Sequence, residues 1–423
     1  MEFPGLLSKR RIVVAVSASI AVYKSLELVR HFIKAGAEVR VVMSEEAKRF
    51  VTPLSFEALS SNVVLHSETE SWADANNHIA LATWAEVFVA APATANTINK
   101  LSNGIADNLL LQTAIACKAP KILAPAANTA MLESPITQAS LKMLKLNGYT
   151  LADEQTGLLA CKVEGKGAMA DPLQIFYLAA RALLNDPYYA LRGMVVTGGG
   201  TVERLDDVRF ISNFSSGKMA KSLVLQAYFK GADVCYITTK ADDDLPSGVH
   251  VIGVESADEM KSAVTDAVRE AKKGVMTPAT LMDGSRPTLV QKKPFFLSAA
   301  AVSDYTPAFT QSGKLKKEML GESWKPELKM GSDILAGTPG EGLYKVGFKA
   351  EFDAATAHES ALTMMKTKSL DTVCLNILGG DINFGSEESR MELITPKGSQ
   401  SIAKASKLTV ADGILSHLKD LGE

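Results

Sequence analysis

One stretch in the middle of the chain, residues 194–221, most restricts what this sequence can fold into. It opens with a short apolar run that predicts a buried strand, and it ends at the start of a helical pattern. Between these lie three glycines and a polar turn: Gly198, Gly199, Gly200, then Ser215, Ser216, Gly217 and Lys218. Glycines after a strand let backbone N–H groups approach a ligand, and the turn adds hydroxyls and an ammonium. The stretch therefore predicts a cradle for a phosphate or a nucleotide.

The order strand, small-residue turn, helix, strand occurs twice in the chain. In the first copy, residues 11–16 and 38–43 form apolar strand patterns around a helical pattern at 20–33. In the second copy, residues 195–197 and 234–238 enclose the glycine stretch and its helix. Parallel strands joined by helices form doubly wound sheets. The sequence therefore predicts an α/β fold with two doubly wound, Rossmann-like domains.

Bulk composition narrows the classes of function. The 423 residues suit two or three domains, and a turn-rich linker near Asn185 favours domains at 1–188 and 189–423. A net charge of −2 gives no electrostatic case for binding nucleic acid or an anionic membrane. No apolar run approaches the length of a membrane helix, and the N-terminus lacks a signal-peptide core. The four cysteines show no metal-ligand spacing, so we expect a reducing, cytoplasmic location.

Small and polar residues follow the predicted strands of the first half. In parallel sheets, ligands bind beyond the carboxyl ends of the strands, so these residues should share one crevice. They are Ser17, Ser19, Ile20, Ser44, Pro92, Thr94, Asn96 and Thr97, and Pro92 is expected to stop the strand that precedes it. The alternative is that the Thr/Asn loop only caps the next helix. Neither domain carries a GxGxxG motif or an acidic residue after its second strand, which argues against a nicotinamide dehydrogenase or reductase.

Two residues of the first half are candidates for chemistry. His78 stands at the start of a helical pattern that leads into the strand before Pro92, although a lone histidine is more often structural than catalytic. Cys161 lies in the glycine-rich segment 157–167, which predicts an exposed thiol on a mobile loop. An idle surface thiol is the alternative for Cys161.

The second half adds an acidic residue and a lysine cluster. An apolar strand pattern at 295–302 ends at Asp304, and the lysines of 314–317 follow. A carboxylate with nearby cations suits Mg²⁺ and a triphosphate. The alternative is an ordinary charged loop, which would have the same sequence pattern. Residues 272–293 are polar and irregular, and predict an insertion or long surface loop with no assignable role.

Taken together, these motifs resemble the bifunctional coenzyme A biosynthesis proteins over nearly the whole chain. That family joins phosphopantothenoylcysteine decarboxylase to phosphopantothenate–cysteine ligase, and its first domain has the flavodoxin-like fold of the flavin-containing cysteine decarboxylases. The motifs that carry the match in the first half are 20–24, His78, 91–97, 104–109, Asn128 and 160–161. Those in the second half are 199–203, 208–209, 213–219, 299–305, 314–317 and 346–348.

The resemblance implies roles in the first domain. FMN would oxidise the thiol end of the substrate to a thioaldehyde-like group that accepts the electrons released as CO₂ leaves. His78 would assist proton removal or flavin reduction, and Asn128 would hold the substrate carboxylate. Cys161, on a mobile flap, would protonate the enethiol intermediate.

The resemblance also implies a CTP-dependent ligase in the second domain. Phosphopantothenate and CTP would form an acyl-cytidylate, which the amine of cysteine then attacks. Asn213 and Lys314 would bind the acylating intermediate and phosphates, Asp304 would face the nucleotide or Mg²⁺, and Phe348 would lie against the base. The further residues expected to bind CTP or phosphopantothenate are Gly199, Gly200, Ser215, Ser216, Gly217, Lys218, Ser298, Ala299, Ala300, Gly331, Ser332, Asp333, Ile334 and Lys368.

Several positions depart from the family pattern. Ala18-Ser19 replaces Gly-Gly before the first helix, where Ser19 is expected to cap the helix and bind a phosphate. Ala127 replaces methionine in the turn before Asn128, which affects the substrate pocket. Gly331-Ser332 replaces Asn-Pro, and Met364 replaces one of two lysines, with Lys368 retained, so the choice between CTP and ATP stays open.

The sequence also allows a second function and implies an assembly. The alternative is a flavin-binding regulatory protein that retains one activity or neither. The presence of both Asn128 and Cys161 favours the enzyme, because a flavin-binding protein needs neither residue. By analogy with the family we expect a homo-oligomer, with trimers of the first domain and dimers of the second combining into a dodecamer.

Overall fold

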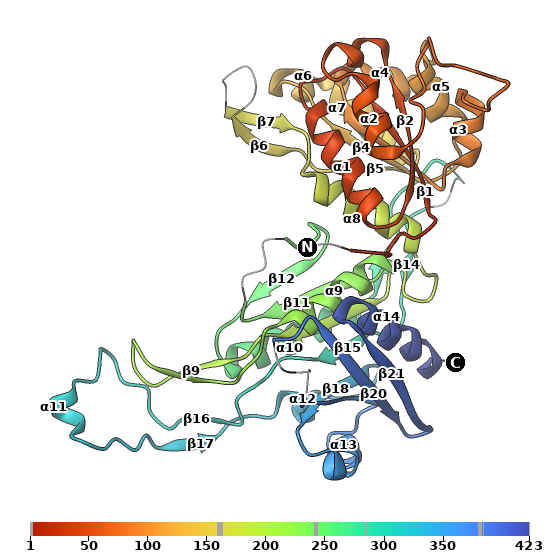
Figure 1. Ribbon diagram of the computed structural model, residues 1–423. Helices are drawn as coiled ribbons and strands as arrows, with labels where there is room; N and C mark the ends of the chain where they lie inside the picture. The colour runs from red at the N-terminus through yellow and green to blue at the C-terminus, as the bar shows by residue number, and fades with distance from the viewer. Residues whose placement is uncertain are drawn as a thin grey trace. The chain divides into compact units, whose positions relative to one another are not determined.

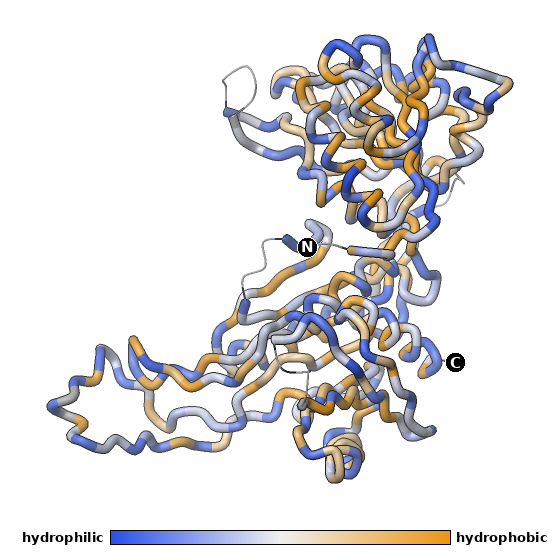
Figure 2. The backbone as a smooth tube through the Cα atoms, in the orientation of Figure 1, coloured by the Kyte–Doolittle hydropathy of each residue, from blue (hydrophilic) through white to orange (hydrophobic). Residues whose placement is uncertain are grey.

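The computed structural model describes residues 3–158, 164–240, 244–282, 284, 286–379, 383 and 385–422. The chain divides into two compact units (Figure 1). The first unit comprises Met1–Asn185 with Pro278–Pro287, and the second comprises Asp186–Thr277 with Thr288–Glu423. Within each unit the hydrophobic stretches gather in the central strands and the helix faces packed on them (Figure 2). No helix among the described residues is long and apolar enough to cross a membrane.

The first unit is built on a five-stranded parallel sheet. Its strands, in spatial order, are β2 (Glu38–Met43), β1 (Arg11–Val16), β3 (Val87–Ala93), β4 (Lys121–Pro125) and β5 (Tyr149–Leu151). Strand β1 is buried along almost its whole length, as expected for a strand covered on both faces. The order of strands reverses between β1 and β3, which is where ligands bind in flavodoxin-like sheets.

Helices cover both faces of this sheet. Helices α1 (Val22–Lys34) and α8 (Pro172–Leu184) pack together on one face, with α2 (Pro53–Ser60) beside α1. The other face buries Val13 and Ala15 under α3 (His78–Trp84), α4 (Ala95–Ser102), α5 (Leu109–Ala116) and α7 (Pro135–Leu146). Side-chain caps set the starts of four of these helices: Asn77 for α3, Thr94 for α4, Asn108 for α5 and Asp171 for α8.

Shorter elements complete the first unit. They are η1 (Glu45–Arg49), α6 (Thr129–Glu133) and the antiparallel hairpin of β6 (Gln155–Leu158) and β7 (Glu164–Ala168).

The second unit contains an eight-stranded sheet. Its order is β12 (His250–Gly253), β11 (Asp233–Thr238), β8 (Gly193–Gly198), β15 (Phe295–Ser298), β18 (Tyr344–Glu351), β19 (Thr372–Ile377), β20 (Glu388–Thr395) and β21 (Gly398–Ser406). The strands from β12 to β19 run parallel, and β20 and β21 are antiparallel. The strand order reverses between β8 and β15, directly beyond the glycines that follow β8. The predicted α/β class with parallel sheets is confirmed.

Helices again lie on both faces of the second sheet. Helices α9 (Lys218–Phe229) and α14 (Lys407–Leu418) pack together, and α10 (Ala257–Ala271), α12 (Ile334–Gly337) and α13 (Ala354–Thr367) bury a separate apolar cluster. An arm extends from the sheet in Figure 1. It consists of β9 (Val202–Arg204), β10 (Phe210–Ser212), β16 (Tyr305–Pro307), α11 (Lys317–Leu320) and β17 (Leu328–Met330). The remaining elements are β13 (Val275–Met276), β14 (Leu289–Val290) and η2 (Lys419–Leu421).

Three local predictions were wrong. Pro92 does not stop its strand, because β3 continues through Pro92 and pairs again with β4 at Ala93 after a register shift. The strand predicted at 295–302 ends at Ser298, because Ala301 leaves the ladder and donates its N–H to Gly199 O at 2.8 Å. The segment 272–293 is not one irregular loop, since its two ends pair as β13 and β14 and its centre belongs to the first unit.

Candidate functional site

The carboxyl edge of the first sheet is closed by hydrogen bonds between neighbouring strand ends. Ser17 Oγ donates to Pro92 O at 2.7 Å and accepts from Thr94 N at 3.0 Å, which joins β1 to β3. Ser44 N donates to Val16 O at 3.0 Å, which joins β2 to β1. The structure thus brings these predicted residues to one edge, but the buried Ser17 hydroxyl is used by the protein's own backbone.

Thr94 is the N-cap of α4, as the alternative for this loop proposed. Its hydroxyl accepts from Thr97 N at 3.2 Å and lies 3.0 Å from the Thr97 hydroxyl, and Asn96 is exposed in the first turn. Ser19 is not the cap of α1, because that position is Ala21; Ser19 Oγ instead accepts from Ala21 N at 3.2 Å.

The groups at this edge fit the phosphate and ring of FMN. Hydroxyls, an amide and the N-terminus of α4 are the donors that phosphate binding requires. Ile20 next to them keeps 60% of its surface exposed, which suits contact with a flat apolar ring. On α4 itself, Asn99 Oδ1 is buried without a hydrogen-bond partner among the described residues.

His78 lies at the first position of α3 and contacts two side chains of the preceding loop. Its Nδ1 is 3.3 Å from Glu70 Oε1, and its ring meets the edge of Trp72 at a centroid distance of 5.7 Å. The preceding residue, Asn77, caps the helix through bonds from Ile79 N and Ala80 N. Because the cap fixes the start of α3, it also fixes the backbone position from which the His78 side chain extends.

Asn128 caps α6 and belongs to a turn that is bonded to the β6–β7 hairpin. Thr129 Oγ1 donates to Lys166 O at 2.6 Å, and Ala127 N donates to Gly167 O at 3.1 Å. A Cβ at Gly165 or Gly167 would overlap this turn, so the hairpin packs closely on it. The segment 157–167 was predicted to be a mobile loop, but its described ends belong to the paired strands β6 and β7. Cys161 lies outside the described residues.

The three other cysteines lack the properties of nucleophiles. Cys117 and Cys374 are buried, and Cys235 is half-buried. Burial raises the pKa of all three thiols, that of Cys235 to about 11. None of the three is therefore a thiolate at neutral pH.

In the second unit, a cavity of about 430 Å³ lies beyond the carboxyl ends of β15 and β18. Of the residues predicted to bind nucleotide or metal, those lining it are Ser298, Ala300, Asp304, Gly331, Ser332, Asp333, Ile334, Phe348 and Lys368. Met364, which replaces a family lysine, lines it as well. Within the described lining, Lys368 is the single cationic side chain. Ala299 is not among the lining residues.

Lys368 is held in place from two sides. Its Nζ lies 2.8 Å from Asp333 Oδ2, and its carbonyl accepts from the buried Lys345 ammonium at 2.9 Å. Burial opposes ionisation of Asp333, but the Ala336 N–H and the Lys368 ammonium outweigh it and lower the pKa of this carboxyl. The Asp333 carboxylate is therefore ionised at neutral pH.

One unpartnered hydroxyl in the described cavity lining fits a polar ligand, and a second lies beside Gly199. Ser303 Oγ, in the cavity lining, and Thr239 Oγ1 are buried without a hydrogen-bond partner among the described residues. A Cβ at Gly199 would overlap Thr239 Oγ1, and the φ of Gly199 is +84°, so this position requires glycine. Gly200 bridges to Ala301 at the reversal of strand order.

Other predicted ligase residues lie beside the cavity or have protein partners. Asn213 Nδ2 donates to Val302 O at 2.9 Å, next to the cavity wall. Ser215 and Ser216 precede Gly217, the left-handed N-cap of α9, and the Lys218 ammonium pairs with Glu387. Lys314 is exposed on the arm and is not among the cavity residues. The described residues contain no cluster of three metal-ligating side chains, and the carboxylates in the described cavity lining are Asp304 and Asp333, of which Asp333 is paired with Lys368.

The base of the arm depends on Asp206, which the sequence did not point out. This buried carboxylate accepts from the N–H groups of Val208, Arg209 and Leu315, and pairs with the Arg209 guanidinium at 2.6 Å. Burial raises its pKa, but these donors outweigh burial and the pKa is lowered overall. A carboxyl with a depressed folded pKa stabilises the fold above its unfolded pKa, and that contribution is lost on acidification.

We therefore expect the arm to loosen as pH falls below about 4, the ordinary carboxyl range, and to be loose at every pH in Asp206→Asn. The ring of Trp324 lies 5.7 Å from the Arg209 guanidinium, so its fluorescence reports the loosening of the arm. Trp72 and Trp84 are replaced by Phe so that Trp324 is the fluorescent tryptophan. Its fluorescence should show an acid transition that Asp206→Asn removes and that the exposed Glu322→Gln retains. The same transition in all three proteins would contradict the assignment.

Two family models together match most of the chain. The family model described as Flavoprotein matches residues 2–183, and the model described as DNA/pantothenate metabolism flavoprotein C-terminal domain matches 190–283 and 279–421. A protein named coenzyme A biosynthesis bifunctional protein CoaBC from Bacillus subtilis (strain 168) is 34% identical over 429 residues, covering 99% of this chain and 98% of its own. Its namesake from Escherichia coli (strain K12) is 33% identical over 402 residues, 93% of each chain.

Solved structures match each half separately. The FMN binding protein AtHal3 is 36% identical, covers 40% of this chain and 95% of its own, and gives a TM-score of 0.36. A crystal structure of the C-terminal domain of a CoaBC protein is 22% identical, covers 56% of this chain and 98% of its own, and gives a TM-score of 0.42.

Proposed function

The chain belongs to the family of coenzyme A biosynthesis bifunctional proteins, and from that premise we propose that residues 1–188 hold its decarboxylase site and 189–423 its ligase site. It is a bifunctional enzyme of coenzyme A biosynthesis that joins a phosphopantothenoylcysteine synthetase to an FMN-dependent phosphopantothenoylcysteine decarboxylase. Two observations support the assignment of sites: Ser17 bonds to Pro92 O and Thr94 N where the first sheet reverses its strand order, and the predicted nucleotide residues of the second unit line one cavity.

In the decarboxylase site, FMN would be held by the strand-end residues Ser19, Ile20, Thr94, Asn96 and Thr97. When bound, the flavin would take two electrons from the thiol end of the substrate and return them after CO₂ has left, so that the overall reaction is redox-neutral. Asn128 binds the substrate carboxylate, and its turn is bonded to the β6–β7 hairpin. His78 exchanges a proton with the substrate, and Cys161 returns a proton to the product.

In the ligase site, the substrate carboxylate attacks the α-phosphorus of CTP, which gives an acyl-cytidylate and pyrophosphate. The amine of cysteine then displaces CMP. Phe348 and Met364 offer apolar surface to the base, and Lys368 and the Ser303 hydroxyl contact the nucleotide phosphates. Asp304 would hold Mg²⁺, which would offset the charge of the triphosphate, since Mg²⁺ sites use one or two carboxylates with substrate phosphates.

The nucleotide is tested by measuring pyrophosphate release from phosphopantothenate and MgCTP or MgATP, followed by cysteine addition. We expect release with CTP and formation of phosphopantothenoylcysteine after cysteine is added. Faster pyrophosphate release with ATP than with CTP would identify ATP as the nucleotide substrate. The departures from the family pattern at Met364 and Gly331-Ser332 allow either nucleotide. Release with neither nucleotide would favour the alternative, a flavin-binding regulatory protein without ligase activity.

We also propose the assembly that the family resemblance implies: trimers of the first domain and dimers of the second in a dodecamer. The exposure of Ile20 (60%) and Tyr23 (61%), both next to the proposed flavin edge, supports a subunit contact there. The cytoplasmic location stays a prediction.

A further inference from the structure

The contact between Glu70 and His78 lies inside the proposed decarboxylase site, and no motif of the sequence includes Glu70. The Glu70 carboxylate is 3.3 Å from Nδ1 of the imidazole, and the two side chains keep 29% and 22% of their surface exposed. Trp72 closes another side of the ring in an edge contact, with an interplanar angle of 88°. The imidazole is thus held by two neighbours from the same loop.

The loop that carries Glu70 is closed on itself just before α3. Ser71 and Asn76 exchange backbone hydrogen bonds of 2.8 and 2.9 Å, so residues 71–76 form a short closed turn. Asn76 Nδ2 donates to Thr69 O at 2.9 Å on the other side of Glu70. Because Asn77 caps the helix, Glu70 and His78 are brought together by the backbone as well as by their own contact.

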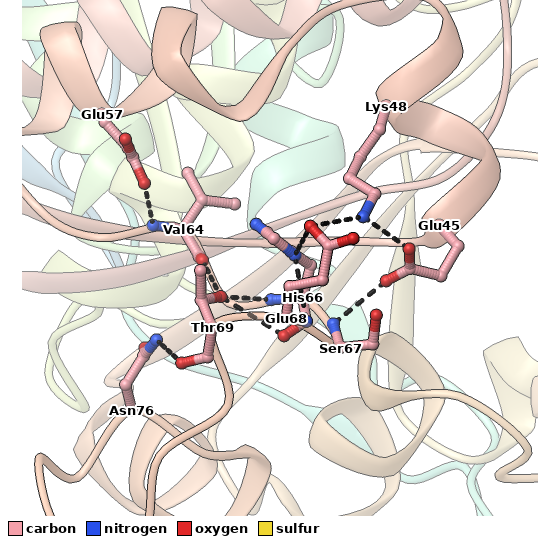
Figure 3. A network of polar contacts seen from close by, with 9 residues as sticks. All are labelled: Glu45, Lys48, Glu57, Val64, His66, Ser67, Glu68, Thr69 and Asn76. Atoms are coloured by element: carbon pink, nitrogen blue, oxygen red, sulfur yellow. Dashed lines mark hydrogen bonds and ion pairs between the residues drawn. The ribbon is translucent and has the colours of Figure 1, made fainter.

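A polar network fixes the start of this loop beside the carboxyl end of β2 (Figure 3). Lys48, on η1, lies 2.6 Å from Glu45 and 3.5 Å from Glu68, and Ser67 N donates to Glu45 at 3.0 Å. The Lys48 ammonium and the Ser67 donors hold the pKa of Glu45 at about 2, so Glu45 is ionised at neutral pH.

Two further bonds continue the network toward Glu70. Thr69 Oγ1 donates to Val64 O at 2.6 Å and accepts from His66 N at 3.0 Å (Figure 3). The residue immediately before Glu70 is therefore bonded to the segment after α2, whose Leu65 pairs with Val42 and Met43 at the end of β2. Glu70 stands at the end of a continuous set of contacts that begins next to Ser44.

We propose that Glu70 is a positioning residue for His78. Its carboxylate accepts a hydrogen bond from Nδ1–H, which selects the tautomer with a free lone pair on Nε2. Nε2 is then the atom that exchanges the proton with the substrate. A wrong tautomer presents an N–H where a base is needed, and its cost in other enzymes is large. The proposal rests on the proposed role of His78.

The experiment compares the flavin-loaded enzyme with Glu70→Gln, Glu70→Asp and a matched control, Glu46→Gln, on the exposed side of η1. Long-range ¹H–¹⁵N spectra of ¹⁵N-histidine-labelled protein report the tautomer of His78, with the signal assigned through His78→Gln. Decarboxylation of phosphopantothenoylcysteine gives kcat and KM.

In Glu70→Gln we expect a mixture of tautomers and a fall in kcat of roughly 10–100-fold with little change in KM. Glu70→Asp retains a carboxylate and should recover part of the wild-type tautomer population and part of kcat. Glu46→Gln should match the wild type in both measurements. A wild-type tautomer and kcat in Glu70→Gln would overturn the proposal. If His78→Gln itself decarboxylates normally, the proposed function of His78 fails, while the spectrum still decides whether Glu70 sets the tautomer.

Discussion

His78→Gln should slow decarboxylation of phosphopantothenoylcysteine by roughly 10²–10⁴-fold, the usual contribution of a positioned acid or base. Glutamine fills similar space and forms hydrogen bonds, but it cannot exchange a proton at neutral pH. Pyrophosphate release by the ligase of the same chain should be unchanged, because the nucleotide cavity is lined by residues of the second unit alone. CO₂ and pyrophosphate are therefore measured on one preparation.

The control for this prediction is His358→Gln, since His358 is an exposed histidine that pairs with Glu392 in the second unit. It should retain both activities. Loss of both activities in His78→Gln would indicate a folding defect, and decarboxylation within about threefold of the wild type would exclude proton transfer by His78.

Lys368→Met should produce the opposite result, a ligase defect with normal decarboxylation. Lys368 is the cationic side chain of the described cavity lining, and its removal leaves the Asp333 carboxylate facing the phosphates without its partner. Hydrogen bonds to charged groups contribute about 1.5–3 kcal/mol. We therefore expect kcat/KM for the nucleotide to fall by roughly 10–100-fold.

Steady-state kinetics with varied CTP check this second prediction. Lys368→Arg should retain part of the affinity, and Lys366→Met, an exposed lysine in the last turn of the same helix, should behave as the wild type. An unchanged kcat/KM in Lys368→Met would place the nucleotide phosphates elsewhere.

Most of the fold could be predicted because its signals are local. Apolar strands, small-residue turns and helical periodicity lie in continuous stretches, and parallel connections restrict how they assemble. The details that failed depend on neighbours distant in sequence. Pro92 stays within its strand because its carbonyl accepts from Ser17, and the strand after Phe295 ends early because Ala301 turns to Gly199.

The candidate sites likewise divide into residues that local motifs predicted and residues that depend on distant neighbours. Motif residues such as Phe348 and Lys368 line one cavity, as expected for residues at neighbouring strand and helix ends. Lys218 was expected to bind phosphate, yet its ammonium pairs with Glu387, far along the chain. Glu70 contacts His78, Lys345 bonds to Lys368 O, and Asp206 bonds to Leu315 N. No spacing pattern in the sequence indicates these contacts.

One measurement tests the central claim, that a single chain performs ligation and then decarboxylation. The purified protein, loaded with FMN, is given phosphopantothenate, MgCTP and cysteine labelled with ¹⁴C in its carboxyl group. We predict release of one pyrophosphate and then one ¹⁴CO₂ for each cysteine consumed, with no second protein added. Pyrophosphate without ¹⁴CO₂, or neither product from FMN-loaded protein, would contradict the claim.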